Sequence, residues 1–329
     1  MVKVNGLCDL GTRVDEYFPQ VDIFISSISH EERYIRGFQL LSEKNVRVNH
    51  KVIFYFNQVL DNYNRADEEA NFDRAFGIVA ADKKLNVDMY NEIEGLLAFR
   101  EYLEQNRILF ENKNILVDLS VMVKPYFLLL LKHLSMIPTN RIGFIYTEPE
   151  AYDIFTNGTL ATKDIPGFSG KKSLSKKEAL AILLGFEGNR AMSVSNEINP
   201  ELTIPVNGFP SFQPKFKDMS IIRNRELLKD VVIFKNLRFA PAYDPFETKN
   251  TLDEMYDGCS DEYNFSIAPL GSKPMALGAG FFALEHDDCR IIYPYPQEYF
   301  PKSSRGWKKS WLYIAKIEGT LTCAPVTCP

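Results

Sequence analysis

Two lysine–proline pairs stand where the sequence most favours binding of an anion. The segment Gly271–Pro274 (GSKP) contains one pair, and Lys124-Pro125 is the other, a few residues after Ser120. Proline suits the first position of a helix, where the next backbone amides point out along the helix axis. These amides and the positive end of the helix dipole attract anions, and a neighbouring lysine adds a mobile positive charge. We therefore expect phosphate-binding residues in both segments. They are Ser120, Lys124, Gly271, Ser272 and Lys273.

The two pairs belong to longer segments with one shared pattern. Residues 115–146 and 266–295 each read as an apolar strand, a polar loop, Lys-Pro, an apolar helix, an arginine and a second apolar strand. The pairs lie 149 residues apart, and the same spacing carries Arg141 onto Arg290 and Tyr146 onto Tyr295 without a gap. Self-similarity at a fixed spacing is the signature of an internal repeat. We predict a tandem duplication.

Alternation of strands and helices sets the expected fold class. Dense apolar runs at 21–26, 51–56, 115–119 and 142–146 are typical of strands that are buried on both faces, and helical segments separate them. The pattern restarts at 181–186. Such alternation builds a parallel sheet with helices on its faces. The prediction is an α/β chain of two tandem Rossmann-like domains, each with a mostly parallel sheet flanked by helices.

Composition shifts suggest the domain boundaries. Residues 1–150 form the first predicted domain, and 151–178 form a linker that contains prolines, glycines and the polar tract SGKKSLSKKE. The second predicted domain covers 179–329 and includes a C-terminal tail with a strand candidate, WLYIAKI. Within this domain the strand 202–206 contains Pro205, which favours an edge position.

The loop after the first strand of each half is a second place for a ligand. In an open parallel sheet, ligands bind outside the carboxyl ends of the strands. Small residues let a ligand approach the backbone, and an arginine there can clamp a phosphate with two hydrogen bonds. A surface ion pair is the alternative fate of Arg33 or Arg190. The candidate ligand-binding residues in these loops are Ser26, Ser27, Gly185, Glu187 and Arg190.

Three side chains are candidates for catalysis: Asp118, Glu187 and His30. Asp118 ends a buried strand, and position 267 of the second copy holds isoleucine instead. An aspartate in this position serves chemistry or caps the following loop through backbone amides. His30 as a general base would need a partner that the sequence does not show. Walker, GxGxxG, HExxH and GxSxG motifs do not occur, and we expect neither a metal nor a cofactor.

Composition narrows the class of protein. Apolar residues make up 45% and charged residues 25% of 329 residues, as is usual in soluble globular proteins. The net charge of −5 argues against a broad non-specific nucleic-acid surface. The N-terminus lacks an apolar run typical of a signal peptide, and the longest aliphatic run, 128–131, is far too short to span a membrane. We expect a cytoplasmic protein without membrane contact.

The strand, loop and Lys-Pro unit resembles the CRISPR-associated Rossmann-fold (CARF) sensor domains. In that family a strand ends in a small-residue loop followed by Lys-Pro-Met and an apolar helix. Ser272–Met275 matches this pattern, and Lys124-Pro125 matches it in part. The resemblance implies a cyclic oligoadenylate as ligand, bound across a two-fold axis between two domains. A tandem duplication would supply a pseudo-two-fold axis within one chain.

The leading functional hypothesis is a nucleotide- or phosphate-binding sensor or regulatory protein in prokaryotic antiviral defence. Its ligand would be an anionic, nucleotide-like small molecule, and both a protein effector and a homodimer remain open. A phosphoester hydrolase acting on a linear or cyclic nucleotide is one alternative. A structural subunit of a defence complex is the other. No recognisable nuclease follows the second half.

Overall fold

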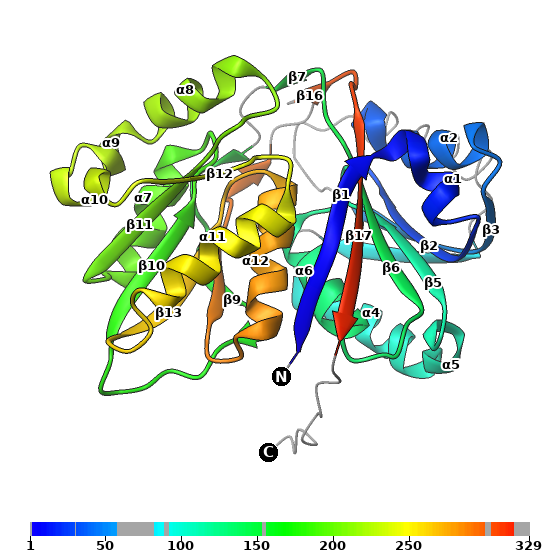
Figure 1. Cartoon of the computed structure of the whole chain (residues 1–329), viewed down its shortest axis with the longest axis horizontal. Helices are drawn as coiled ribbons and strands as arrows, with labels where there is room; N and C mark the ends of the chain where they lie inside the picture. Colours follow the sequence, from blue (N-terminus) through cyan, green and yellow to red (C-terminus); the bar gives the residue numbers. More distant parts are fainter. Residues whose placement is uncertain are drawn as a thin grey trace. The chain divides into compact units, whose positions relative to one another are not determined.

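The structure, a computed structural model, describes residues 2–29, 31–57, 82–88, 92–152, 156–299 and 304–318. The chain divides into two compact units (Figure 1). The first unit combines residues 1–149 with residues 306–329, and the second unit contains residues 150–305.

The first unit is built on a seven-stranded sheet in the order β1-β17-β6-β5-β2-β3-β4. The strands from β6 to β4 are parallel, and β17 runs antiparallel to both β1 and β6. The strands are β1 (Lys3–Leu10), β2 (Gln20–Ile28), β3 (Arg47–Asn57), β4 (Lys83–Asp88), β5 (Asn114–Asp118), β6 (Arg141–Thr147) and β17 (Ser310–Glu318). The α-helices are α1 (Val14–Tyr17), α2 (Arg36–Glu43), α4 (Glu92–Gln105), α5 (Arg107–Phe110) and α6 (Lys124–Leu134).

The second unit is built on a six-stranded sheet in the order β12-β11-β10-β13-β14-β9. All its neighbouring strands are parallel except β9, which is antiparallel to β14. The strands are β9 (Ala161–Ser169), β10 (Lys177–Leu183), β11 (Leu202–Gly208), β12 (Arg238–Ala240), β13 (Tyr263–Pro269) and β14 (Arg290–Tyr295). The helices are α7 (Gly188–Ile198), α8 (Pro214–Arg223), α9 (Arg225–Leu228), α10 (Val231–Lys235), α11 (Pro245–Asp257) and α12 (Lys273–Glu285). Two short ribbons pair β7 (Ala151–Tyr152) with β16 (Ser304–Arg305) and β8 (Thr156–Asn157) with β15 (Glu298–Tyr299).

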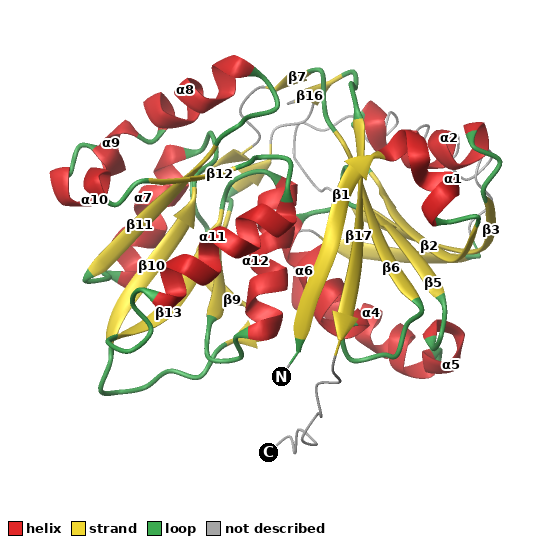
Figure 2. Ribbon diagram, in the orientation of Figure 1, coloured by secondary structure: helices red, strands yellow, loops and turns green. Residues whose placement is uncertain are grey.

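The predicted fold class is confirmed. Each unit is an α/β fold with a mostly parallel sheet flanked by helices (Figure 2). Numbered along the chain, the five parallel strands have the order 5-4-1-2-3 in both sheets, and an antiparallel strand lies beside strand 5. This is the strand order of a Rossmann-like doubly wound sheet, in which the chain leaves strand 1 in one direction and returns on the other side at strand 4. The topological switch points therefore lie between β2 and β5 and between β10 and β13.

The helices cover the sheets because each strand presents apolar residues on both faces. In the first unit, Phe24 packs edge-on against Phe38 of α2, with ring centroids 4.9 Å apart. On the opposite face, Phe54 packs against Phe99 of α4 at 4.9 Å. In the second unit, α12 is buried from Pro274 to Leu284 and packs against α11. A Cβ on Gly278 would collide with the carbonyl oxygen of Pro245, so this glycine permits the close approach of the two helices.

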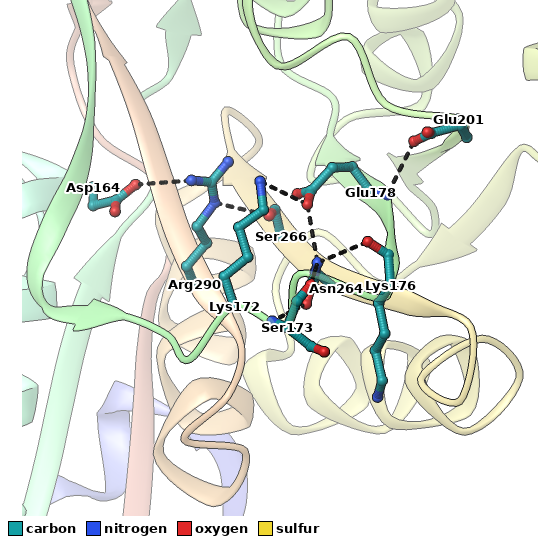
Figure 3. Close-up of polar contacts among 9 residues, drawn as sticks. All are labelled: Asp164, Lys172, Ser173, Lys176, Glu178, Glu201, Asn264, Ser266 and Arg290. Atoms are coloured by element: carbon teal, nitrogen blue, oxygen red, sulfur yellow. Dashed lines mark hydrogen bonds and ion pairs between the residues drawn. The ribbon is translucent and has the colours of Figure 1, made fainter.

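The prediction of a linker over residues 151–178 is wrong. Its central part is β9, a strand of the second sheet, and its last residues begin β10. The polar tract between them is fixed by Asn264, whose amide nitrogen donates to the carbonyl oxygens of Ser173 and Lys176 (Figure 3). Asn264 Oδ1 also accepts from the Ser173 amide over 2.8 Å. The tract reads as a linker because its side chains are polar, but its backbone is bound to the sheet.

Two further sequence predictions are corrected. The tail assigned to the second domain contains β17, which lies in the first sheet, where Trp311 pairs with Tyr146 and Leu312 with Ile145. The segment 202–206 belongs to β11, which lies between β10 and β12 rather than at an edge. Pro205 is tolerated because β12 pairs with β11 only from Val206 onward, so Pro205 pairs with β10 alone.

Candidate functional site

The carboxyl edge of the second sheet is closed by two loops at the switch point between β10 and β13. A Cβ on Gly185 would collide with the carbonyl oxygen of Leu270. A Cβ on Gly271 would lie 3.0 Å from Met275 Sδ and 3.3 Å from the carbonyl oxygen of Leu184. Both glycines therefore allow the two loops to pass each other at backbone distance. From the sequence, we expected the small size of Gly185 and Gly271 to let a ligand approach the backbone. In the structure, the space beside each glycine is filled by residues of the same unit.

The α12 N-terminus starts directly beside these loops. Ser272 is the N-cap residue, and its Oγ accepts a hydrogen bond from the Met275 amide over 3.2 Å and donates to the carbonyl oxygen of Ala242. Pro274 occupies the first turn, as the sequence predicted. Lys273 is half-buried at the first helical position. The arrangement is a capped thirteen-residue helix that directs its positive end and a lysine to the carboxyl edge of the sheet.

Arg190 is held inside the second unit. Its side chain is 4% exposed, so the alternative of a surface ion pair is wrong. Nη1 lies 2.6 Å from Glu187 Oε2 and 3.3 Å from Thr156 Oγ1, and Nε donates to the carbonyl oxygen of Pro294 over 3.0 Å. The guanidinium also lies over the ring of Tyr293. These contacts tie the loop after β10 to the end of β14.

Arg33 makes the matching contacts in the first unit. Its Nη2 pairs with Glu31 Oε2 at 2.9 Å, and its Nη1 donates to the carbonyl oxygen of Thr147 over 2.8 Å. The guanidinium lies over the ring of Tyr146, 5.8 Å from its centroid. Arg33 is also fully buried. In both units a glutamate–arginine pair follows the first parallel strand, and its buried arginine donates to a backbone carbonyl at the end of the fifth strand, Thr147 in one unit and Pro294 in the other.

Asp118 and Ser120 close the other loop of the first unit. Asp118 is 2% exposed, and its Oδ1 accepts a hydrogen bond from the Ser120 amide over 2.8 Å. Ser120 Oγ accepts in turn from the Thr147 amide over 2.9 Å. The Asp118 carboxylate also lies directly against Gly37 of α2, where a Cβ would collide with Oδ2. The sequence left two roles open for Asp118, chemistry or capping of the following loop, and the structure shows the capping contact.

Ser26 and Ser27 are both buried in β2 and point to opposite faces of the sheet, as neighbouring residues of a strand do. Ser26 lies on the face of the sheet that α2 covers. It comes directly after Ile25, whose pairing with Val117 is the last between β2 and β5. Ser27 Oγ has no hydrogen-bond partner among the residues that the structure describes. The two serines therefore lie beneath the loops rather than on them.

The α6 N-terminus differs from that of α12. Lys124 is half-buried at the first helical position, but the N-cap residue is Val123, which has no side-chain oxygen to bond to the first amides. Met122, in the preceding loop, is fully buried. The second unit therefore has a serine cap and a loop glycine that the first unit lacks.

His30 lies outside the described residues. In the described part of the chain, no group of three or more His, Cys, Asp or Glu side chains is placed to hold a metal ion. Over the same residues, no helix combines the length and hydropathy that a membrane span requires.

Aromatic side chains around the second sheet were missed by the sequence analysis. Phe186, in the loop after β10, contacts Phe216 of α8 and Tyr152 of β7, with ring centroids 5.3 and 6.1 Å apart. Phe209, directly after β11, and Phe239, in the middle of β12, contact each other with ring centroids 6.2 Å apart and are about half exposed. The aromatic residues themselves are visible in the sequence, but their grouping depends on the strand order, which the sequence does not show.

Comparisons with known proteins support the fold. No family model and no curated protein sequence matches the chain. Among solved structures, the chain is similar to a Type III CRISPR defence DNA nuclease activated by cyclic oligoadenylate, with a TM-score of 0.52 at 10% sequence identity. The match covers 83% of this chain and 65% of the nuclease, so the chain spans about two thirds of that protein's length. At this identity the similarity shows the fold alone.

Two other solved structures match at lower TM-scores. One is a functionally unknown protein from Pseudomonas aeruginosa, with 10% identity, a TM-score of 0.23, and coverage of 84% of this chain and 93% of the other. The second is a universal stress protein from Archaeoglobus fulgidus, with 8% identity, a TM-score of 0.24, and coverage of 84% and 97%. These scores are too low to bear on function.

Proposed function

We propose that the protein is a sensor or regulatory protein that binds an anionic, nucleotide-like ligand at the carboxyl edge of the second sheet. The observation that carries the proposal is the start of α12. A serine-capped helix, a lysine at its first position and a loop glycine meet beside the switch point between β10 and β13. Open α/β sheets bind ligands at such a point, and helix N-termini there favour phosphate.

A role in prokaryotic antiviral defence agrees with the similarity in fold to a CRISPR defence nuclease that cyclic oligoadenylate activates. The agreement extends to the Lys-Pro-Met segment, Lys273–Met275, through which the sequence resembles CARF domains. A cyclic oligoadenylate is accordingly the first ligand to test. A protein effector would receive the signal.

The proposal includes a duplicated origin for the two units. The shared 5-4-1-2-3 strand order supports it, and so do the helix starts at Lys124 and Lys273, which have the 149-residue spacing of the sequence repeat. The paired contacts of Arg33 and Arg190 add a feature that the sequence repeat did not include.

Binding is favoured over turnover because the two acidic candidates for catalysis, Asp118 and Glu187, are engaged in hydrogen bonds within the fold. Asp118 Oδ1 caps the Ser120 amide, and the Glu187 carboxylate accepts from Arg190 and Thr156. Both carboxylates thus stabilise the folded loops. No specific contact of the described residues favours a hydrolase or a purely structural subunit.

Isothermal titration calorimetry with cyclic tetra-adenylate, cyclic AMP, ATP and inorganic phosphate tests the proposal. We expect one of the nucleotides to bind and Lys273→Ala to weaken its binding by about 10- to 100-fold, since a charge-assisted hydrogen bond is worth about 1.5–3 kcal/mol. Lys163→Ala, which removes an exposed lysine from β9 of the same unit, is the matched control and should leave the affinity unchanged. Equal affinities of the Lys273→Ala variant and the native protein would reject the site.

The rival functions give different results in the same experiment. Conversion of a nucleotide in the presence of Mg²⁺, lost in Asp118→Ala, would establish the hydrolase instead. Failure of every nucleotide to bind, combined with a stable protein partner, would favour the structural subunit.

A further inference from the structure

A small surface of the second unit exposes apolar side chains that the fold leaves uncovered. Three of the five residues of α10 are largely exposed: Val231 at 65%, Val232 at 68% and Phe234 at 52%. The neighbouring strand β12 adds Phe239 at 46%. Soluble proteins rarely place several large apolar residues together in water unless the surface binds something.

The segment is ordered by its other residues, so the exposure is a property of a folded surface. Ile233 and Leu237 pack against the core cluster below α7 and α9. Asp230 caps α10 by accepting from the amides of Val232 and Ile233, at 2.8 and 3.2 Å. Val231, Val232 and Phe234 therefore point outward because Ile233 points inward, as the geometry of one helical turn requires.

The charges on this surface are positive and unbalanced. The acidic residues nearby are engaged, since Glu226 pairs with Lys229 at 2.6 Å and Asp230 caps the helix. Lys235 and Arg238 are exposed, and neither has an acidic partner among the residues that the structure describes. The whole chain nevertheless carries a net charge of −5. This surface is therefore locally basic and apolar on a chain that is acidic overall. We call it the α10–β12 surface and define it by Val231, Val232, Phe234, Lys235, Arg238 and Phe239.

The surface also contains a strand edge. β12 is the last strand of the second sheet, and it pairs on one side with Val206–Gly208 of β11. Ala240 accepts from the Phe209 amide and so faces β11, which leaves the backbone amide and carbonyl of Phe239 on the outer side of this three-residue strand. An edge flanked by apolar side chains is a template for pairing with an extended peptide.

From these observations we propose that the α10–β12 surface docks an extended, acidic and apolar segment of a partner protein, which adds a strand to β12. Its apolar side chains would cover Val232, Phe234 and Phe239. Its carboxylates would pair with Lys235 and Arg238. This surface would connect a ligand-binding protein to another component and does not depend on the ligand site at α12.

The charges decide between this occupant and others. A second copy that paired β12 with β12 would bring Arg238 and Lys235 close to their own equivalents, which is repulsive. Anionic membranes are recognised by clusters of about four to eight basic residues, and nucleic acids need a similarly broad basic surface. Two cations beside aliphatic residues and an open strand edge suit an acidic peptide better.

Fluorescence polarisation with labelled model peptides tests the proposal on the full chain. A short peptide of alternating glutamate and valine should bind, and the Lys235→Glu/Arg238→Glu variant should bind it about tenfold more weakly. Val232→Ser/Phe234→Ser should weaken binding to a similar extent while the charges are kept. All four residues are exposed, so the circular dichroism of both variants should match the native protein. Lys3→Glu/Arg47→Glu, which removes two exposed cations from the first unit, is the control and should bind normally.

Two further probes separate strand pairing from simple attraction. A glutamate–valine peptide with every backbone amide N-methylated has the same charge and side chains but no amide donors, and it should fail to bind. A lysine–valine peptide should also fail. Equal binding of the N-methylated peptide, or an unchanged affinity in both double variants, would overturn the proposal. Stronger binding to phosphatidylglycerol vesicles or to a single-stranded oligonucleotide, lost in the same variants, would replace the peptide by that partner.

Discussion

The guanidinium of Arg33 donates a hydrogen bond over 2.8 Å to the carbonyl oxygen of Thr147, which is 114 residues away in the chain. The contact joins the loop after the first parallel strand of the first unit to the end of the fifth. Arg190 makes the corresponding bond to Pro294 in the second unit. Each carboxyl edge is thus fixed by a buried arginine.

Arg33→Met should destabilise the first unit by about 3–5 kcal/mol, because it leaves the Glu31 carboxylate buried without its cation. Arg107→Met, which breaks an exposed pair with Glu111 in the same unit, should cost less than about 1 kcal/mol. Urea unfolding followed by circular dichroism gives both values. The double variant Glu31→Leu/Arg33→Met should recover much of the loss, and a double variant as unstable as Arg33→Met would argue against the buried ion pair.

Gly37→Ala tests the contact between α2 and Asp118. Alanine normally stabilises a helix relative to glycine, but its Cβ would collide with the Asp118 carboxylate, so we expect a loss of about 1–3 kcal/mol in the free energy of unfolding. Gly258→Ala, at the end of α11 with only ordinary contacts, should be neutral or slightly stabilising. In Gly37→Ala/Asp118→Ala the two effects should not add, because the second change removes the collision. Strict additivity would show that the two residues do not touch.

Fragments of the chain test the domain boundaries. Residues 150–305 should fold alone with a cooperative unfolding transition, since they contain every strand of the second sheet. Residues 1–149 should not, because they lack β17, which pairs with both β1 and β6. Joining residues 306–329 to Pro149 by a short Gly/Ser linker should restore the fold, as circular dichroism and thermal unfolding would show. A stable fragment 1–149 would contradict the assignment of β17 to this sheet.

Acid should destabilise the first unit through His133. Burial, helped by the charge of Arg100, lowers the pKa of His133 from 6.5 to about 4. The unfolded chain therefore binds a proton below pH 6.5 that the folded protein does not bind until about pH 4, and stability falls across this window as the pH falls. The loss should reach about 2–3 kcal/mol near pH 4. In His133→Gln the free energy of unfolding, measured between pH 7 and pH 4, should fall less steeply, and parallel curves for the two proteins would reject this origin.

The candidate site was predictable where local signals define it. The sequence placed the lysine–proline pairs at the starts of two helices because proline at the first position and an apolar run afterwards are local features. The sequence could not show that Arg33 and Arg190 are buried. Their partners Thr147 and Pro294 are more than a hundred residues away, and an arginine after a polar loop has no local mark of burial.

The sequence by itself determined the order of these elements and the 149-residue spacing between them. β5 and β13, α6 and α12, and β6 and β14 begin 149 residues apart in each case, as the aligned residues required. Apolar runs, turn residues and helix starts are encoded over a few neighbouring residues, so they can be recognised in a single sequence. Only the tertiary structure decided that β9 and β17 lie beside the fifth parallel strand of their sheets and that residues 306–318 return to the first unit. Strand pairing joins backbone groups that are alike in every residue, and the partner is selected by packing of whole faces rather than by local sequence.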